Sequence, residues 1–382
     1  MVLLALLLFL AAGAGAEEMQ MRVFVSRGAM EESTAAQLVR LLGGAYAHAQ
    51  WTLEMEGSES LRDLVLDDRA PQIAICHPGE ALPWAREGLL IPLTGAITGQ
   101  RQIQQQVLSC CVDAERLFIA PLAARQRCMA VNRKMMEEKQ MGYLLREIEH
   151  PVWYVTQFHQ LMDEFMIAGG TAFDVWPMQT ETSAGIEALI QVLYGGALLA
   201  DDGLTCMAGE PAVCAGVKWL RDMIRSGLVG YVGNREEALE RFIGGKTPVF
   251  IDWTEETQKA YAAQIERSGL ELIEMPYPSS TGDVVRVFEV TGAAAFADDD
   301  AALNDLAVKA IAFLHTDAQA QRVLGTRGIK RDDARWLADL SMRDRGVTLR
   351  ALFAQAMHAV LEEGAEPGEA LLMLQALMDA GQ

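Results

Sequence analysis

Short apolar segments of strand character alternate with amphipathic helical segments at the start of this chain. Residues 21–26 alternate in polarity, residues 30–42 repeat their apolar side chains at helical spacing, and residues 51–55 return to strand character. A further helix over residues 58–67 and a buried strand over residues 71–76 follow. Because a helix between two strands of one sheet makes them parallel, this order predicts a parallel sheet wrapped by helices.

Helices dominate the rest of the chain, and short apolar strands separate them. Strands are predicted over residues 89–93, 117–122, 247–251, 270–275 and 284–296. Helices are predicted over residues 155–168, 183–194, 211–226, 236–243, 301–314, 348–362 and 367–378. This second run of strands and helices indicates a second α/β unit.

Composition limits the class of protein. The 382 residues carry 32 Lys and Arg against 52 Asp and Glu, a net charge of −20. With 51% hydrophobic residues, the chain can bury enough apolar surface to fold, and its length predicts two domains or one large α/β unit. Nucleic-acid binding is not expected, because the basic residues are scattered and phosphate backbones need a clustered basic face.

The first 16 residues form an apolar run that ends in small residues. Ala14, Gly15 and Ala16 fit a signal-peptidase site of the A-x-A type, so residues 1–16 predict a secretory signal peptide and an exported, extracytoplasmic protein. A buried N-terminal helix is the alternative. No Cys follows the run, so a lipid anchor at this site is not expected, and no later stretch predicts a membrane span.

The six cysteines show no metal-binding pattern. None forms a CxxC pair and no His lies at ligand spacing, so we expect no metal site. In an exported protein, Cys206 and Cys214 are the best candidates for a disulfide. Ordinary buried thiols are the alternative.

Motifs of catalysis and cofactor binding are absent from the sequence. Residues 244–247 (GGKT) resemble the end of a phosphate-binding loop, but Glu240 stands where the first Gly is required and a strand follows instead of a helix. We interpret the Gly pair as a helix stop. No GxSxG, HExxH or GxGxxG occurs, so we expect neither an enzyme nor a cofactor.

Several landmarks, in order, give the chain a family resemblance. They are residues 71–74 (PQIA), 85–93 (AREGLLIPL), 119–122 (IAPL), 131–133 (VNR), 194–199 (YGGALL), 242–246 (FIGGK), 250–253 (FIDW), 307–314 with 319–321, and 366–371 (EPGEAL). The chain thereby resembles the extracytoplasmic solute-binding proteins of ABC importers, in the group that captures sugars and oligosaccharides.

The resemblance implies a fold and partners. It implies the two-lobed periplasmic-binding-protein fold (type II), with α/β lobes joined by a hinge around a central cleft. We expect residues 17–123 plus 290–328 in lobe I and residues 124–289 plus 329–382 in lobe II. The implied partners are a carbohydrate and the permease subunits of an ABC transporter, with the receptor acting as a monomer.

Two tryptophans are candidates for a sugar platform, since sugar rings present apolar faces to flat aromatic surfaces. Trp253 follows a predicted strand, at a point where the resembling family stacks a Trp on the sugar. Trp176 also follows a short strand-like segment. A position in the core is the alternative for both.

Polar candidates follow the strands of the first unit. Arg27, Glu56 and His77 come after its first three strands, where ligand clefts of α/β sheets lie. Arg125 matches a position of a polar ligand contact in the resembling family. An interlobe salt bridge is the alternative for Arg125, and solvated loop positions are the alternative for the other three.

Two other functions stay open at this point. The chain could be a ligand-sensing module that reports to a receptor kinase, or a secreted enzyme on a two-lobed fold. The lack of a nucleophile or metal pattern argues against the enzyme.

Overall fold

A computed structural model describes most of the chain. The described residues are 19–97, 105–145, 152–180, 182–200, 202–324 and 335–380. The predicted signal peptide and the predicted lobe boundary at residues 328–329 lie outside these ranges.

The first three strands form the expected parallel arrangement. Strand β1 (Met19–Val25) pairs in parallel with β2 (Ala49–Met55) on one side and with β3 (Ile73–Cys76) on the other. Helices α2 (Glu32–Ala45) and α3 (Leu61–Leu66) connect them. The predicted β-α-β start is therefore confirmed, and the carboxyl ends of the three strands meet at one edge of the sheet.

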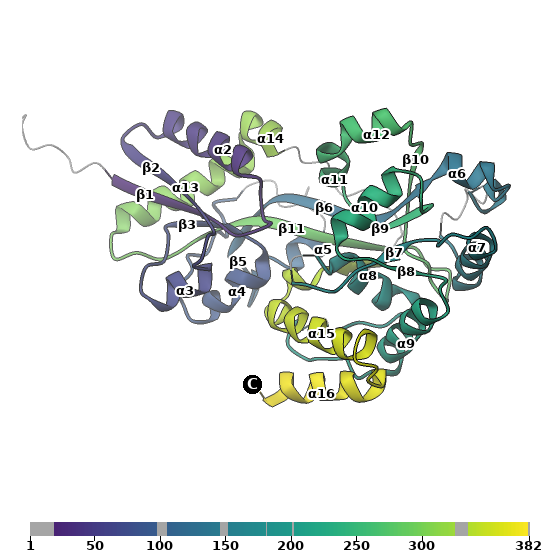
Figure 1. The fold of residues 1–382 in the computed structure, drawn as a ribbon. Helices are drawn as coiled ribbons and strands as arrows, with labels where there is room; N and C mark the ends of the chain where they lie inside the picture. The colour runs from purple at the N-terminus through teal and green to yellow at the C-terminus, as the bar shows by residue number, and fades with distance from the viewer. Residues whose placement is uncertain are drawn as a thin grey trace, which may run out of the picture.

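Two long strands extend this sheet into the second half of the molecule (Figure 1). Strand β11 (Val285–Ala295) pairs antiparallel with β3 and with the first half of β6 (Ile119–Asn132). The second half of β6 pairs with β9 (Val249–Trp253) and β10 (Leu272–Met275). The sheet is thus mixed instead of purely parallel, because β6 and β11 run antiparallel to each other as they pass between the halves.

The chain passes between the two halves of the molecule a third time in a short segment, which we call the third passage. Strand β12 (Arg335–Ala338) pairs in parallel with the start of β11 and leads into the 3₁₀ turn η3 (Leu340–Met342). The predicted strand over residues 89–93 is not present, since only Leu90 forms an isolated bridge, to Phe296.

Helices α2 and α3, together with the other helices, cover both halves of the sheet (Figure 1). The others are α4 (Pro78–Arg86), α5 (Gln105–Ser109), α6 (Arg133–Glu138), α7 (Val155–Ile167), α8 (Ala184–Leu193), α9 (Pro211–Arg225), α10 (Arg235–Ile243), α11 (Glu255–Ala260), α12 (Ala262–Ser268), α13 (Ala301–Thr316), α14 (Ala318–Leu324), α15 (Gly346–Leu361) and α16 (Pro367–Ala380). Short strands β4 (Val112–Asp113), β5 (Arg116–Leu117), β7 (Asp174–Val175) and β8 (Gly230–Tyr231), and the turn η2 (Gly142–Leu145), complete the elements. Among the described residues, no helix combines the length and apolar character needed to cross a membrane.

Two hydrophobic cores divide the buried residues. The first core, around β1–β3, α2 and α13, ends on β6 at Leu122, and the second core begins at Cys128. On β11 the change falls between Val287 and Phe288. We call the elements around each core the first and second lobe.

The third passage moves between the cores twice. Ala338 packs in the first core, Leu340 in the second, and Met342 in the first again. Helix α4 of the first lobe lies against this turn so closely that a Cβ on Gly79 would stand 2.2 Å from the Arg343 carbonyl oxygen. A glycine is therefore required at Gly79 for this contact between the lobes.

Cys206 and Cys214 are both thiols. The backbone of Cys206 forms an isolated β-bridge with Leu199. Cys214 lies on α9, and its Sγ contacts the Gly209 carbonyl at 3.6 Å. The disulfide expected between Cys206 and Cys214 is therefore not present. Their placement as thiols in and against the second core is the alternative drawn from the sequence.

We expect Cys206 and Cys214 to be alkylated without prior reduction once the protein is denatured. In the native protein the reaction at pH 8 should be much slower, because burial raises the pKa of both thiols and the thiolate is the reactive form. Peptide mass spectrometry measures both states. A disulfide-linked peptide pair from protein purified without reductant would contradict this placement.

Candidate functional site

A layer of charged side chains separates the two cores. On β6, Arg127 lies between the last residue of the first core and the start of the second. Its guanidinium pairs with Asp252 at the end of β9 and with Glu289 on β11, the latter at 3.0 Å. Arg125, two residues earlier, contacts the same Glu289 at 3.3 Å. We call Arg125, Arg127, Asp252 and Glu289 the charged layer.

Asp252 is the most enclosed member of the layer. Besides Arg127, it accepts from Arg235 of α10, whose Nη2 also bonds the Asp252 carbonyl at 3.0 Å. Helix α8 lies directly against it, because a Cβ on Gly185 would stand 2.5 Å from the Asp252 Cβ. Burial acts to raise the pKa of Asp252, but the two guanidinium groups outweigh it and hold the pKa below its usual range.

The pKa of Glu289 is governed by the same two opposing effects, burial and nearby positive charge. Burial is the largest effect and opposes its ionisation, but Arg127, together with His77 and Arg125, outweighs the burial and lowers the pKa of Glu289.

A second buried ion cluster lies in the second lobe. Arg350 of α15 donates Nε to both carboxylate oxygens of Glu187 on α8 at 3.0 Å, and Nη2 to Asp339 at 2.7 Å. Asp339 also accepts from the backbone and hydroxyl of Ser341. Burial is overcome at Asp339, where Arg350 and Arg127 hold the pKa well below its usual range, whereas burial raises the pKa of Glu187.

Arg125 links the two lobes. Its Nη2 donates to the carbonyl of Ala29 at 3.0 Å, in the loop that follows β1, and its Nε pairs with Glu256 of α11 at 2.5 Å. Arg125 therefore holds a first-lobe loop and a second-lobe helix at once. This is the interlobe salt bridge that the sequence offered as the alternative to a ligand contact.

Two of the other polar candidates lie together. The Arg27 backbone donates to the Glu56 carboxylate at 2.9 Å, as the adjacent ends of β1 and β2 require. Partial burial raises the pKa of Glu56.

His77 directly follows β3, which pairs with β11, and its Nδ1 lies 3.0 Å from the Val290 carbonyl of β11. The structure thus places Arg27, Glu56, His77 and Arg125 around the edge where β1–β3 end and β11 crosses.

The two tryptophans lie in the second core. Trp253 has no exposed surface and packs edge-on against Phe242 and Phe250. Trp176 is equally buried, stacks on Phe250, and donates Nε1 to the Thr182 carbonyl at 3.0 Å. A ring with no exposed face cannot stack on a ligand, so in this conformation both residues occupy the core position that the sequence left open.

Buried donors without partners mark the same region. Among the described residues, Ser26 Oγ, Arg127 Nε and Trp253 Nε1 are buried and make no hydrogen bond. They come from the end of β1, the crossing strand β6 and the end of β9. Buried polar atoms normally find a partner, so three unpartnered donors near the boundary between the two cores are unusual.

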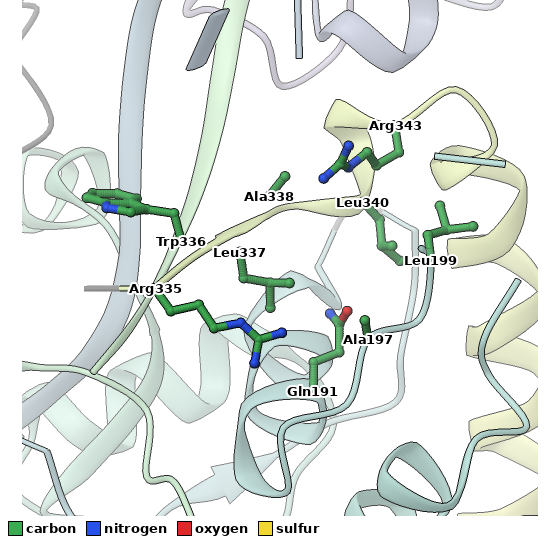
Figure 2. A pocket seen from close by; sticks show the side chains of 9 residues that line it. All are labelled: Gln191, Ala197, Leu199, Arg335, Trp336, Leu337, Ala338, Leu340 and Arg343. Carbon is green, nitrogen blue, oxygen red and sulfur yellow. The ribbon is translucent and has the colours of Figure 1, made fainter. Parts of the chain in front are cut away.

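A cavity of about 280 Å³ lies beside the third passage (Figure 2). It is lined by Gln191, Ala197, Leu199, Arg335, Trp336, Leu337, Ala338, Leu340 and Arg343. None of these residues was predicted as a site residue. Strand β12 was not recognised in the sequence, although Trp336 and Leu337 there are a short apolar pair typical of a strand.

The described residues contain no group of three or more His, Cys, Asp or Glu side chains that could hold a metal ion.

No protein-family model and no curated protein matches the chain. Solved structures do. An ABC substrate-binding protein from Listeria monocytogenes, solved with cycloalternan, aligns with a TM-score of 0.73 at 10% identity over 96% of this chain and 99% of its own. The GacH receptor of Streptomyces glaucescens aligns with a TM-score of 0.73 at 13% identity, over 95% and 98%. The sugar-binding protein MalE from Xanthomonas citri aligns with a TM-score of 0.73 at 12% identity, over 95% and 97%.

These alignments run over nearly the full length of both chains. The predicted fold class is therefore confirmed: the chain has the two-lobed α/β fold of periplasmic binding proteins.

Replacing Trp253 by Ala should lower the free energy of unfolding by about 3–5 kcal/mol, because it removes a fully buried ring from the second core. Urea denaturation measures this loss. Trp253→Phe should cost less, since it keeps one ring. Unchanged stability together with weakened sugar binding would instead restore the stacking role.

Acid should destabilise the protein through the buried ion pairs. The pKa values of Asp252, Glu289 and Asp339 are lowered in the folded state, so their stabilisation is complete above the unfolded values of about 4 and is lost as pH falls through the folded values. The raised pKa of Glu187 works in the opposite direction.

We expect Asp339→Asn to lower stability at pH 7 and to flatten the fall in stability below about pH 4. The exposed Asp299→Asn serves as the matched control and should change neither. Urea denaturation across pH measures both slopes. Parallel slopes for wild type and Asp339→Asn would contradict the role of this ion pair.

Proposed function

We propose that this protein is the extracytoplasmic substrate-binding component of an ABC importer and captures a carbohydrate between its two lobes. The observation that carries the proposal is the fold, which is shared over nearly the whole chain with proteins solved in complex with carbohydrates. The Listeria protein was solved with cycloalternan, and the GacH receptor with acarbose.

The charged layer supports a carbohydrate that carries no net charge. Arg125, Arg127 and Arg235 are matched by Asp252, Glu256 and Glu289 in the ion pairs of the described residues. A site whose charges are already paired offers directional hydrogen bonds without a net field. Neutral hydroxyl groups suit such a site.

Capture would couple to movement of the lobes. Arg125 bonds the Ala29 carbonyl in one lobe and Glu256 in the other, so a ligand that replaces these contacts changes how the lobes are held together. A receptor of this kind binds its sugar and releases it unchanged to the permease subunits. Export to the periplasm or cell surface, a monomeric state and the absence of catalysis belong to the same proposal.

Thermal unfolding of the purified protein with neutral sugars tests this function. Maltose, maltotriose, cycloalternan and chitin oligosaccharides form the panel. At about a hundredfold excess over Kd, a ligand that binds only the folded state adds about 2.7 kcal/mol, which should raise Tm by several degrees. The sugar should be recovered chemically unchanged.

In this proposal the Arg125 guanidinium exchanges Glu256 and the Ala29 carbonyl for the sugar, so Arg125→Gln should weaken binding of the active sugar at least tenfold, a loss of about 1.4 kcal/mol or more. Arg133→Gln, at an exposed position on α6, is the matched control and should bind like wild type. No shift with any sugar of the panel would contradict carbohydrate capture. Formation of a new product would favour the enzyme.

A further inference from the structure

We propose that the cavity beside β12 is a second ligand site, which binds a single sugar acid through its carboxylate. It is separate from the charged layer, shares no residue with it, and does not depend on the proposed function. The argument rests on the charge, the free strand edge and the size of this cavity.

The cavity is cationic. Arg335 and Arg343 line it, and none of its described lining residues is Asp or Glu. Among the described residues, none forms a hydrogen bond or ion pair with the Arg335 guanidinium, and Figure 2 shows this side chain extending from β12 toward Gln191 of α8. A guanidinium fork binds a carboxylate through two parallel hydrogen bonds, so an anion is the matching ligand.

The free edge of β12 supplies further polar groups. The backbone amides of Arg335 and Asp339 donate toward β11, at 3.0 Å to Val284 and 2.8 Å to Phe288. Because backbone groups alternate in direction along a strand, those of Trp336 and Ala338 point to the opposite edge, where no other described strand pairs. These amides and carbonyls can bond the hydroxyl groups of a sugar.

The remaining lining fits one sugar ring. Leu199, Leu337 and Leu340 provide apolar contacts for its C–H groups. Gln191 is 5% exposed and already held, since its Oε1 accepts from the Leu198 amide at 3.0 Å. At about 280 Å³, the cavity is just below the usual range of about 300–1,000 Å³ for small-molecule sites, so it suits a monosaccharide better than an oligosaccharide.

Calorimetry with D-glucuronate, D-galacturonate, glucose and galactose tests this site. Each uronate should bind at least tenfold more tightly than its neutral hexose. Raising the salt from about 0.1 M to about 1 M should weaken uronate binding, because it screens the guanidinium charge. Arg335→Gln should weaken uronate binding at least tenfold. Arg62→Gln, an exposed position on α3, is the matched control and should bind within twofold of wild type.

Several results would overturn the assignment. A sugar-acid site would be excluded if both uronates bind with a Kd above about 1 mM. It would also be excluded if the neutral hexoses bind as tightly as the uronates. Tighter binding of glucose 6-phosphate would exclude the carboxylate as the preferred anion. Loss of uronate binding in Arg125→Gln but not in Arg335→Gln would move the ligand to the charged layer.

The two proposals fail separately. If the neutral sugar panel gives no shift while uronate binding responds to Arg335→Gln, only carbohydrate capture between the lobes is contradicted. If a neutral sugar binds and the uronates do not, only the second site is contradicted. The Tm of Arg335→Gln without ligand should match wild type, because the side chain is exposed and makes no ion pair with a described residue.

Discussion

The pairing of Arg127 with Asp252 and Glu289 is the interaction on which the rest of the structure depends. These side chains lie where the chain leaves one hydrophobic core and enters the other, so they cannot be solvated as surface charges are. Taking a charge out of water costs several kcal/mol, and removing one partner of a buried pair costs about 3–5 kcal/mol. The pairing therefore fixes how β6, β9 and β11 sit against one another.

This layer also explains why the two cores stay separate. A continuous apolar strand would merge them, but β6 carries two arginines between Leu122 and Cys128. Each arginine needs carboxylates from both directions. Arg125 finds one on β11 and one on α11, so the same residues that divide the cores also join the lobes.

Much of the fold could be predicted because its elements are local patterns. The alternation that begins with residues 21–26 reproduces β1, α2 and β2 within a few residues, and the long amphipathic segments in the second half match α7, α8 and α9. The full length of β6 could not be predicted, because its centre is polar and is stabilised only by partners far along the chain. Arg127 and Asp252 are 125 residues apart.

The candidate site shows the same limit. That Arg27, Glu56 and His77 would lie near one sheet edge follows from strand order alone. The burial of Trp253 could not be predicted in this way, because a Trp at a strand end fits a core and a ligand platform equally well until its neighbours are known. The cavity beside β12 depends on contacts between residues about 140 positions apart, for which local patterns carry no signal.

A double-mutant cycle on Arg127 and Asp252 tests the central claim most directly. Arg127→Met, Asp252→Asn and the double variant are compared with wild type by urea denaturation. If the pair fixes the crossing, each single change removes one of the two partners of a buried charge, and the coupling free energy should be about 1–3 kcal/mol. Additive effects, with coupling below about 0.5 kcal/mol, would show that the two cores hold their arrangement without this pair.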